Sequence, residues 1–535
     1  MTTPRSISQL IDNLVADKPD ATAVHYSGRA LDYASLDARA RRLAGFLASR
    51  GVGPGDRVAF WLPSVPAYLS LFLACTRLGA IAVAVNTRYR AAEVGDILQR
   101  SRARVLALWP GFRDIDFTAI LDGVDPSMLS AIDTVLIYDE DGQPPPTMGN
   151  LSDRTTVSFA EADAYPPFQE DFGGPDAPCN IFTTSGTTSR PKLVLHRQLA
   201  IAHHAAEVVR GFGLDGPNTV TLQALPFCGV FGFCQLMAGL ASGRPMAMLA
   251  AFDAAEAVRL CARHRVTQFN ATDDMVDRML AAAPDDTPFA ALDFVGYAAF
   301  NRELDDLPAR AERRGVRMVG LWGMSEMQAL VSRRDADAPL RERQKAGGRL
   351  VSPDAEARVR DPESGRLLPP GEAGMLEIRG PSRMIEYLDN PDATAETITE
   401  DGYVRTGDLA RMEEDGGFEF LARMGDTLRL GGFLVAPAEI ESEIMELPGV
   451  TAAQVVETSD AGRTRPVAFV TLDVGAVLDE PEALAQCAER LANFKRPARI
   501  VAVDTFPVTD SANGKKIQRA KLRDMAQDLL TSAGL

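Results

Sequence analysis

Short apolar runs alternate with amphipathic stretches along most of the chain. Runs of strand length are separated by segments in which apolar residues recur with helical spacing, such as 91–101 and 253–265. Because a parallel pair of strands needs a crossover connection, usually a helix, this alternation predicts α/β layers with mainly parallel sheets. The predicted strands are 57–63, 104–110, 133–139, 246–252 and 316–323.

The pattern changes near residue 423, where elements become shorter and charged residues more frequent. Helical spacing appears at 439–447 and 481–494, and strand-like runs appear at 451–458 and 465–472. We therefore predict an α/β fold with a large N-terminal domain of layered, mainly parallel sheets and helices over 1–423. A hinge at 424–426 would lead to a small, mobile α+β C-terminal domain over 427–535.

Length and charge narrow the classes of protein that fit. A chain of 535 residues is too long for one ordinary core, which stops growing near about 250–300 residues. The net charge of −17 disfavours nucleic acid and anionic membrane surfaces as partners. The longest uncharged stretch, 217–243, contains Gln223, Pro226 and Gln235, so we interpret it as buried core and predict no membrane span.

The cysteines and the N-terminus favour a cytoplasmic protein. The six cysteines form no CxxC pair and match no zinc or disulfide pattern, which fits a reducing compartment. The first residues have no basic region followed by an apolar core and a cleavage site, so no secretory signal is expected. The oligomeric state stays open, with a homodimer among the options.

The strongest local motif is the hydroxyl-rich segment 183–192, which follows the apolar pair Ile181 and Phe182. Hydroxyls, backbone N–H groups and two cations suit a polyphosphate. Composition alone would also fit a flexible Ser/Thr linker, although the strand before the motif and the Pro-Lys ending weaken that alternative. The spacing is not that of a P-loop, and the glycine-rich segment 51–55 lacks GxGxxG spacing and is predicted to be a turn.

The segment FTTSGTTSRPKL resembles the phosphate loop of the adenylate-forming superfamily, which includes acyl- and aryl-CoA ligases. Ser189 and Leu193 stand where that pattern has glycines. The resemblance implies that the loop holds the β- and γ-phosphates of ATP through Thr183, Thr184, Ser185, Gly186, Thr187, Thr188 and Lys192.

Further segments resemble motifs of the same family in the same order. WGMSE at 322–326 is similar to [YW]GxTE, and YVRTGD at 403–408 is similar to YRTGD. The resemblance implies that Ser325 meets the α-phosphate, that Glu326 helps hold Mg²⁺, and that Asp408 binds the ribose hydroxyls. Ala298 lies in the segment expected to contact adenine. The other nucleotide contacts implied are Trp322, Gly323 and Arg423.

The C-terminal part completes the resemblance, which runs from about residue 7 to Arg523. Gly425 occupies the position of the hinge, and Gly431 and Gly432 match the loop that serves the CoA step. The segment 513–523 resembles the stretch with the family's catalytic lysine. Aligning KIQRAKLR gives Lys516, whereas strict adjacency to glycine gives Lys515; we favour Lys516. An ammonium there would meet the charge that develops during adenylation.

Near residue 229 the chain departs from the family pattern. The segment LPFCGVFGF has Gly229 where many ligases have a histidine, and this predicts a wider or differently gated acyl pocket. Phe233-Cys234-Gln235 replaces the aspartate of amino-acid-activating domains, so an acyl or aryl acid is preferred. The predicted pocket residues are Phe227, Gly229, Phe231, Phe233, Asn270, Ala298, Met324 and Met327.

The resemblance implies an ATP-dependent carboxylate-CoA ligase that forms acyl-AMP and then acyl-CoA, releasing AMP and pyrophosphate. Lys516, Glu326 and Ser325 would be catalytic, and ATP, Mg²⁺, CoA and a small carboxylic acid would be the ligands. Two alternatives stay open at this point: an acyl-AMP ligase that loads a carrier protein, and a degenerate nucleotide-binding protein.

Overall fold

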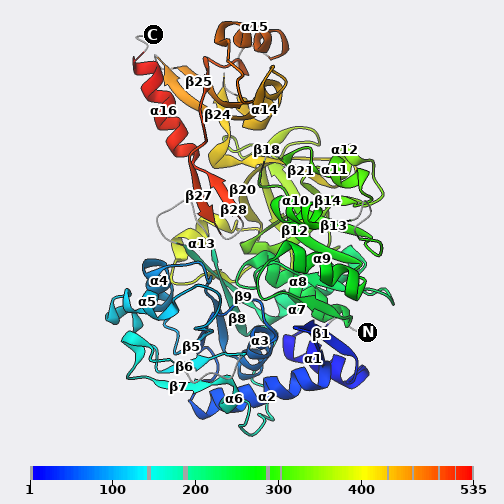
Figure 1. Cartoon of the computed structure of the whole chain (residues 1–535), viewed down its shortest axis with the longest axis vertical. Coiled ribbons are helices and arrows are strands. Elements are labelled where there is room, and N and C mark those ends of the chain that lie inside the picture. The colour runs from blue at the N-terminus through cyan, green and yellow to red at the C-terminus, as the bar shows by residue number, and fades with distance from the viewer. Residues whose placement is uncertain are drawn as a thin grey trace.

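A computed structural model describes residues 4–140, 146–184, 191–284, 289–301, 304–430, 433–460, 463–491, 495–511 and 514–532. Figure 1 shows a large body that contains both major sheets and a smaller body at its upper end, formed by the C-terminal residues. The division agrees with the predicted fold class of a large α/β part and a small α+β part.

The first major sheet has eight strands, of which the central ones are parallel. β3 pairs in parallel with β4 and β5, and β4 continues to β8. Only β9 and β19 at one edge run antiparallel to their neighbours. The order is β19 (Glu386–Tyr387), β9 (Lys192–Arg197), β8 (Pro178–Thr184), β4 (Ile81–Ala84), β3 (Arg57–Trp61), β5 (Val105–Leu108), β6 (Thr134–Ile137) and β7 (Thr155–Ser158).

The second major sheet has thirteen strands, and its strand pairing changes from parallel to antiparallel along its width. From β1 to β14 its neighbours are parallel, whereas from β14 to β17 they are antiparallel. The order is β17 (Glu356–Arg360), β18 (Ala373–Arg379), β20 (Val404–Met412), β21 (Phe418–Arg423), β16 (Gly347–Leu350), β15 (Gln328–Arg333), β14 (Met318–Met324), β13 (Phe294–Ala298), β12 (Gln268–Thr272), β10 (Thr221–Gln223), β11 (Met246–Met248), β1 (Thr22–Tyr26) and β2 (Arg29–Asp32).

Helices cover these sheets and fill the space between them. α3 is buried along its whole length. α8, which lies in the uncharged stretch 217–243, is buried along most of its length, as predicted for that stretch. The larger helices of this part are α1 (Ile7–Asp17), α2 (Tyr33–Ser49), α3 (Pro66–Leu78), α4 (Ala91–Ser101), α7 (Gln198–Phe212), α8 (Val230–Ser242), α9 (Ala254–His264) and α10 (Asp273–Ala282). Shorter helices are α5 (Phe117–Asp122), α6 (Phe159–Ala162), α11 (Leu307–Arg313), α12 (Leu340–Arg343) and α13 (Pro391–Thr397).

Two sequence interpretations can be compared directly with these elements. Within the described residues, no helix is both long and apolar enough to cross a membrane. The turn from β2 into α2 is set by Asp32, which caps the helix by accepting a hydrogen bond from the Ser35 amide at 2.7 Å. The six cysteines are all buried and free.

The small part is built on a three-stranded sheet of β24 (Val450–Asp460), β25 (Arg463–Leu472) and β26 (Arg499–Ala502). One face packs on α14 (Pro437–Met445) and α15 (Glu480–Arg490), and the other on α16 (Arg519–Ser532). Two hairpins complete it: β22 (Leu428–Leu430) with β23 (Phe433–Val435), and β27 (Val508–Ser511) with β28 (Gly514–Ile517). In Figure 1 the β27–β28 hairpin extends from the small part toward the large part.

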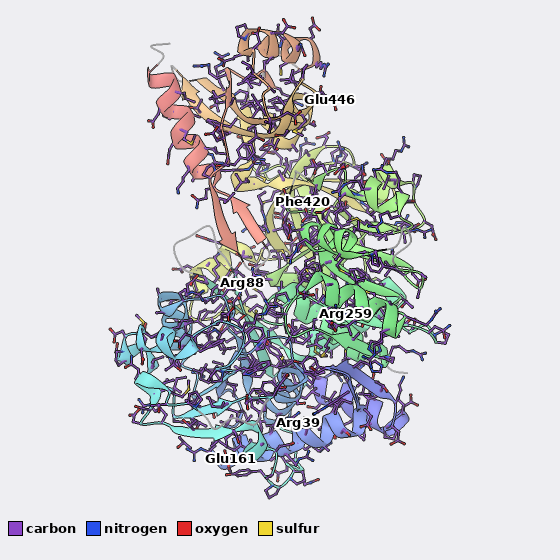
Figure 2. All side chains as sticks on the ribbon, viewed as in Figure 1. Arg39, Arg88, Glu161, Arg259, Phe420 and Glu446 are labelled. Atoms are coloured by element: carbon purple, nitrogen blue, oxygen red, sulfur yellow. The ribbon has the colours of Figure 1, made fainter. Side chains whose placement is uncertain are left out.

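The connection between the two parts is the short turn η5 (Met424–Asp426), which directly follows β21. Figure 2 shows Phe420 of β21 at the upper end of the large part and Glu446, just after α14, in the small part. The Arg523 guanidinium of α16 donates a hydrogen bond to the Gly425 carbonyl oxygen at 2.8 Å. The last helix of the chain therefore contacts the turn at which the small part begins.

Candidate functional site

Three neighbouring parallel strands end at one edge of the large sheet. β12, β13 and β14 are in parallel register, with Thr272 opposite Ala298, so their carboxyl ends lie side by side. In open α/β sheets, ligands bind outside this edge. Ala298 lies at the end of β13 and is half-buried, and Trp322 and Gly323 lie near the end of β14.

The segment after Ala298 is held in place by a buried carboxylate that the sequence did not single out. Asp273 Oδ2 accepts hydrogen bonds from the amides of Phe300 and Asn301, both at 2.7 Å. Asp273 is the first residue of α10, and burial raises the pKa of its carboxyl group. The predicted adenine-contacting segment is thus anchored to the start of the helix that follows β12.

Asp408 lies inside the large sheet with both carboxylate oxygens engaged. The Trp322 indole donates to Oδ2 at 2.9 Å, and the Arg423 guanidinium forms an ion pair with Oδ1 at 3.0 Å. Asp408 and Arg423 are directly opposite each other in the β20–β21 register. Three residues from separate predicted motifs therefore meet around one carboxyl group.

Burial sets the charge state of this carboxyl group. Desolvation raises the pKa of Asp408 to about 6, and the Arg423 charge and the Trp322 hydrogen bond oppose that rise. The negative charge of Glu326 raises it slightly further. Asp408 Oδ1 lies next to Arg423 but accepts no hydrogen bond within the described residues, so it can accept one from a ribose hydroxyl.

Glu326 and Lys192 approach the same aromatic side chain from different elements. Ser325 and Glu326 form the turn η4 (Ser325–Met327) directly after β14. The Tyr387 hydroxyl donates to Glu326 Oε1 at 2.6 Å, and the Lys192 ammonium lies 4.4 Å from the centre of the Tyr387 ring. The predicted phosphate-binding lysine and the predicted metal-binding carboxylate are thus brought together through Tyr387.

The backbone of this turn is fixed by two further contacts that sequence reasoning missed. The His196 imidazole lies 2.8 Å from the Ser325 carbonyl oxygen, and the Met384 amide donates to the Glu326 carbonyl oxygen at 2.7 Å. Burial lowers the pKa of His196 to about 4, so the ring is neutral near pH 7 and donates through Nε2. His196 lies on β9, and Tyr387 lies on the neighbouring edge strand β19. The apolar run after the Pro-Lys ending could have pointed to His196, whereas nothing in the sequence singled out Tyr387.

The phosphate-loop prediction falls on a hairpin between β8 and β9. Thr183 and Thr184 end β8 and pair with Leu193 and Lys192 of β9. The Thr183 side chain also hydrogen-bonds Tyr89. Ser185, Gly186, Thr187 and Thr188 lie outside the described residues.

The predicted acyl-pocket residues belong to three hydrophobic clusters. Phe227 and Phe233 lie in one cluster, Phe231 and Ala298 in a second, and Met324 and Met327 in a third. Phe233 is fully buried and packs edge-on against Phe72 and Phe182. A pocket lined by these residues would require a space where the three clusters adjoin. The acyl pocket therefore stays a prediction.

Gly229 and Asn270 differ in how much freedom their surroundings leave. A Cβ atom added at Gly229 would meet only the Pro226 carbonyl oxygen, at 3.6 Å, and the backbone angles there suit any residue. Asn270 is buried, and its side-chain oxygen accepts from Gln268 at 3.1 Å. The structure thus leaves room for a side chain at residue 229, as the pocket prediction requires.

Most of the C-terminal predictions stay untested by direct contacts. Gly425 has open space around its Cα and a negative φ, so this conformation does not itself require glycine. Gly431 and Gly432 lie outside the described residues. Lys515 and Lys516 lie on β28, and only their backbone is described.

The residues around Glu326 suit Mg²⁺ bound together with a nucleotide. Mg²⁺ is usually held by one or two carboxylates plus substrate phosphates. Glu326 supplies one carboxylate, partly exposed, beside the strand that leads from the phosphate loop. In the described part of the chain, the three-residue group close enough to hold a metal by itself is His203, Glu207 and Asp354, which includes none of the predicted site residues.

Comparisons with known proteins agree with this arrangement. The model of the AMP-binding enzyme family matches residues 11–388, and that of the AMP-binding enzyme C-terminal domain matches residues 439–515. The chain is 31% identical to a feruloyl-CoA synthase of Amycolatopsis sp, over 94% of this chain and 96% of that protein. It is 30% identical to the 3-[(3aS,4S,7aS)-7a-methyl-1,5-dioxo-octahydro-1H-inden-4-yl]propanoyl:CoA ligase of Mycobacterium tuberculosis, over 97% and 99%. The solved structure of ATP-bound MatB from Rhodopseudomonas palustris superposes with a TM-score of 0.81 at 29% identity, covering 98% of this chain and 99% of that one.

The chain belongs to the AMP-binding enzyme family, whose two domain models together match most of its length.

Asp408→Asn is expected to raise the free energy of unfolding at pH 8 by about 2 kcal/mol, because a neutral amide is cheaper to bury than a carboxylate. The folded-state pKa of about 6 lies above the ordinary 3.8, so the native state binds more protons between these values. The wild type therefore loses stability as pH rises from 4 to 6, and the gain of the variant vanishes below pH 4. Urea unfolding at several pH values measures this.

The control for this prediction is Asp401→Asn, for which the expected change in the free energy of unfolding has the opposite sign. Hydrogen bonds from Arg358 and Thr399 hold the pKa of the exposed Asp401 below its ordinary range. Its replacement should lower stability above pH 4. An Asp408→Asn variant that is no more stable than the wild type at pH 8 would contradict the assigned cost of burying this charge.

Proposed function

We propose that this chain is an ATP-dependent carboxylate-CoA ligase whose substrate is a carboxylic acid that contains a ring. The supporting observation is the juxtaposition of Lys192, Tyr387 and Glu326 beside the Asp408 carboxylate, in a chain matched by the family model along most of its length. Positive charge, a metal-binding acid and a ribose acceptor are the groups that adenylation requires.

The reaction has two steps. In the first, a substrate carboxylate oxygen attacks the α-phosphorus of ATP, pyrophosphate leaves, and acyl-AMP forms. Lys192 and the loop after Thr184 hold the β- and γ-phosphates, Ser325 meets the α-phosphate, and Asp408 and Arg423 hold the ribose. Mg²⁺, when bound at Glu326, neutralises phosphate charge, and Lys516 stabilises the charge that develops at the α-phosphate.

In the second step the CoA thiolate attacks the acyl carbon, and AMP leaves. The small domain, 427–535, would rotate about Gly425 between the steps, withdrawing Lys516 and bringing Gly431 and Gly432 toward the site. Open space around the Gly425 Cα is compatible with such a hinge. A carrier-protein acceptor is not favoured, because the relatives described above are named for CoA.

A ring-bearing acid is favoured by two observations. The feruloyl-CoA synthase and the octahydro-indenyl-propanoyl:CoA ligase both act on acids with rings. Gly229 leaves open space where many ligases have a histidine, and most of the predicted pocket residues are apolar or aromatic. A homodimer and a cytoplasmic location stay expectations from the sequence.

The function is tested by mass-spectrometric detection of acyl-AMP and acyl-CoA. Purified protein with ATP and Mg²⁺ would be supplied with fatty, alicyclic and aromatic acids, with and without CoA. Acyl-CoA from ring-bearing acids supports the proposal. If CoA does not consume the acyl-AMP, the proposal that CoA is the acceptor is wrong. A preference for unbranched fatty acids would contradict the proposed class of ring-bearing substrates.

Lys516→Ala is expected to lower the rate of acyl-AMP formation by at least about 100-fold, because the transition state loses a cation. Formation of acyl-CoA from supplied acyl-AMP should change little, since that step uses the other domain position. Separate assays of pyrophosphate release and of the second half-reaction measure the two effects. Lys515→Ala is the matched control, and equal loss of both half-reactions in Lys516→Ala would contradict the role.

Gly229→His is expected to raise the KM for ring-bearing acids about tenfold or more, while short-chain acids are affected little, because the imidazole would occupy the open space. Gly229→Ala adds only a methyl group and serves as the control. Steady-state kinetics across acids of increasing size measure the change. An unchanged size profile in Gly229→His would show that residue 229 does not border the acyl pocket.

A further inference from the structure

Tyr387 lies where the two major sheets approach each other. It belongs to β19, at the edge of the eight-stranded sheet, where it pairs with Val194 of β9. Its amide donates to the Thr394 side chain of α13 at 3.0 Å, and its side chain is almost fully buried. Both the backbone and the ring of Tyr387 are therefore fixed by structure outside the turn that contains Glu326.

The Tyr387 hydroxyl makes a short hydrogen bond to the side chain of Glu326. It donates to Glu326 Oε1 at 2.6 Å. A short hydrogen bond to a carboxylate is stronger than one between neutral groups. One carboxylate oxygen of Glu326 is thus held in a set direction by a donor that is itself anchored.

The backbone and the carboxylate of Glu326 are held by different groups. His196 and Met384 hold the carbonyl groups of Ser325 and Glu326, at 2.8 and 2.7 Å. These contacts fix the turn but leave the side-chain torsions of Glu326 free. The direction of the carboxylate therefore depends on the hydroxyl of Tyr387.

The ring of Tyr387 also faces the ammonium group of Lys192. The Lys192 ammonium lies over the ring at 4.4 Å from its centre, and within the described residues no carboxylate forms an ion pair with Lys192. A cation–π contact of this kind contributes about 0.5–2 kcal/mol. Breaking a buried ion pair would cost more free energy. Lys192 can therefore turn to an incoming polyphosphate without first leaving Glu326.

We propose that Tyr387 is a positioning residue that presets the Glu326 carboxylate for the metal ion of the nucleotide complex and holds Lys192 ready for the phosphates. This inference rests on the proposed function, since it assigns the ligands of that same site. Tyr387 itself contacts neither the carboxylic acid nor the nucleotide in the roles assigned above, so it acts through Glu326 and Lys192. Removing a group that hydrogen-bonds a metal ligand typically lowers metal affinity or activity by about 10–100-fold.

Tyr387→Phe removes the hydroxyl and keeps the ring, so it separates the two roles. We expect the affinity for Mn²⁺ in the complex with a non-hydrolysable ATP analogue to fall about tenfold, as measured by electron paramagnetic resonance. The Mg²⁺ concentration for half-maximal pyrophosphate release should rise by a similar factor. Formation of acyl-CoA from supplied acyl-AMP should stay at the wild-type rate, because it does not use the metal-bound triphosphate.

Tyr387→Leu removes the ring as well. It should show the same loss of Mn²⁺ affinity and, in addition, a higher KM for ATP than Tyr387→Phe, because Lys192 loses the surface that holds it. The matched control is Tyr26→Phe, since the Tyr26 hydroxyl also donates to a glutamate, Glu140, at 2.6 Å but far along the chain from the site. That variant should bind Mn²⁺ like the wild type.

Several outcomes would overturn the proposal. Unchanged Mn²⁺ affinity in Tyr387→Phe would show that the hydroxyl does not preset Glu326. Equal losses in both half-reactions, or a lowered unfolding temperature like that of a core variant, would assign Tyr387 a structural role. Combining Tyr387→Phe with Glu326→Gln should add little to the loss from Glu326→Gln alone, and full additivity would also contradict it.

Failure of the proposed function would look different. If the wild type forms no acyl-AMP with any acid of the panel, the ligase assignment fails whatever Tyr387 does. The Mn²⁺ measurement needs only the nucleotide analogue, so it tests Tyr387 independently of the acid. A wild type that turns over while Tyr387→Phe binds Mn²⁺ normally would refute only the positioning role.

Discussion

The buried carboxylate of Asp408 joins the two halves of the larger sheet. It lies on β20 in the antiparallel half, and it accepts a hydrogen bond from Trp322 at the end of the parallel half. Arg423, which pairs with it, is the last residue before the turn to the small part. Burial penalises the ionised carboxylate, and the Arg423 charge and the Trp322 hydrogen bond offset part of that cost, so both partners hold the carboxylate in place. The predicted ribose contact and the start of the small part are thus tied to one ion pair.

A second junction joins the two major sheets to each other. The turn after β14 belongs to the larger sheet, whereas His196 and Tyr387 belong to the neighbouring strands β9 and β19 of the smaller one. Their hydrogen bonds bring Glu326 next to Lys192, whose strand leads from the phosphate loop. The candidate site is therefore a property of the interface between two sheets, where a nucleotide can contact both. This location follows the general tendency of ligands to bind beyond the carboxyl ends of parallel strands.

Hydrophobic patterning was sufficient for much of the fold. The predicted strands 57–63, 104–110 and 133–139 correspond to β3, β5 and β6, because a strand buried on both faces needs a continuous apolar run. The antiparallel half from β15 to β17 was not predicted. In β17 exposed and half-buried residues surround the buried Val359, so polar residues interrupt the apolar signal.

By itself, the sequence determined the class of protein, the order of the large and small parts and the hydroxyl-rich and acidic motifs predicted to bind the nucleotide, since these depend on local composition and spacing. It could not show that Trp322 and Arg423 meet at Asp408, or that Tyr387 contacts both Glu326 and Lys192. Those contacts join residues far apart in the chain, and strand register and sheet packing alone decide them. The pKa of Asp408 has the same origin, because desolvation depends on what covers a group and not on its neighbours in the chain.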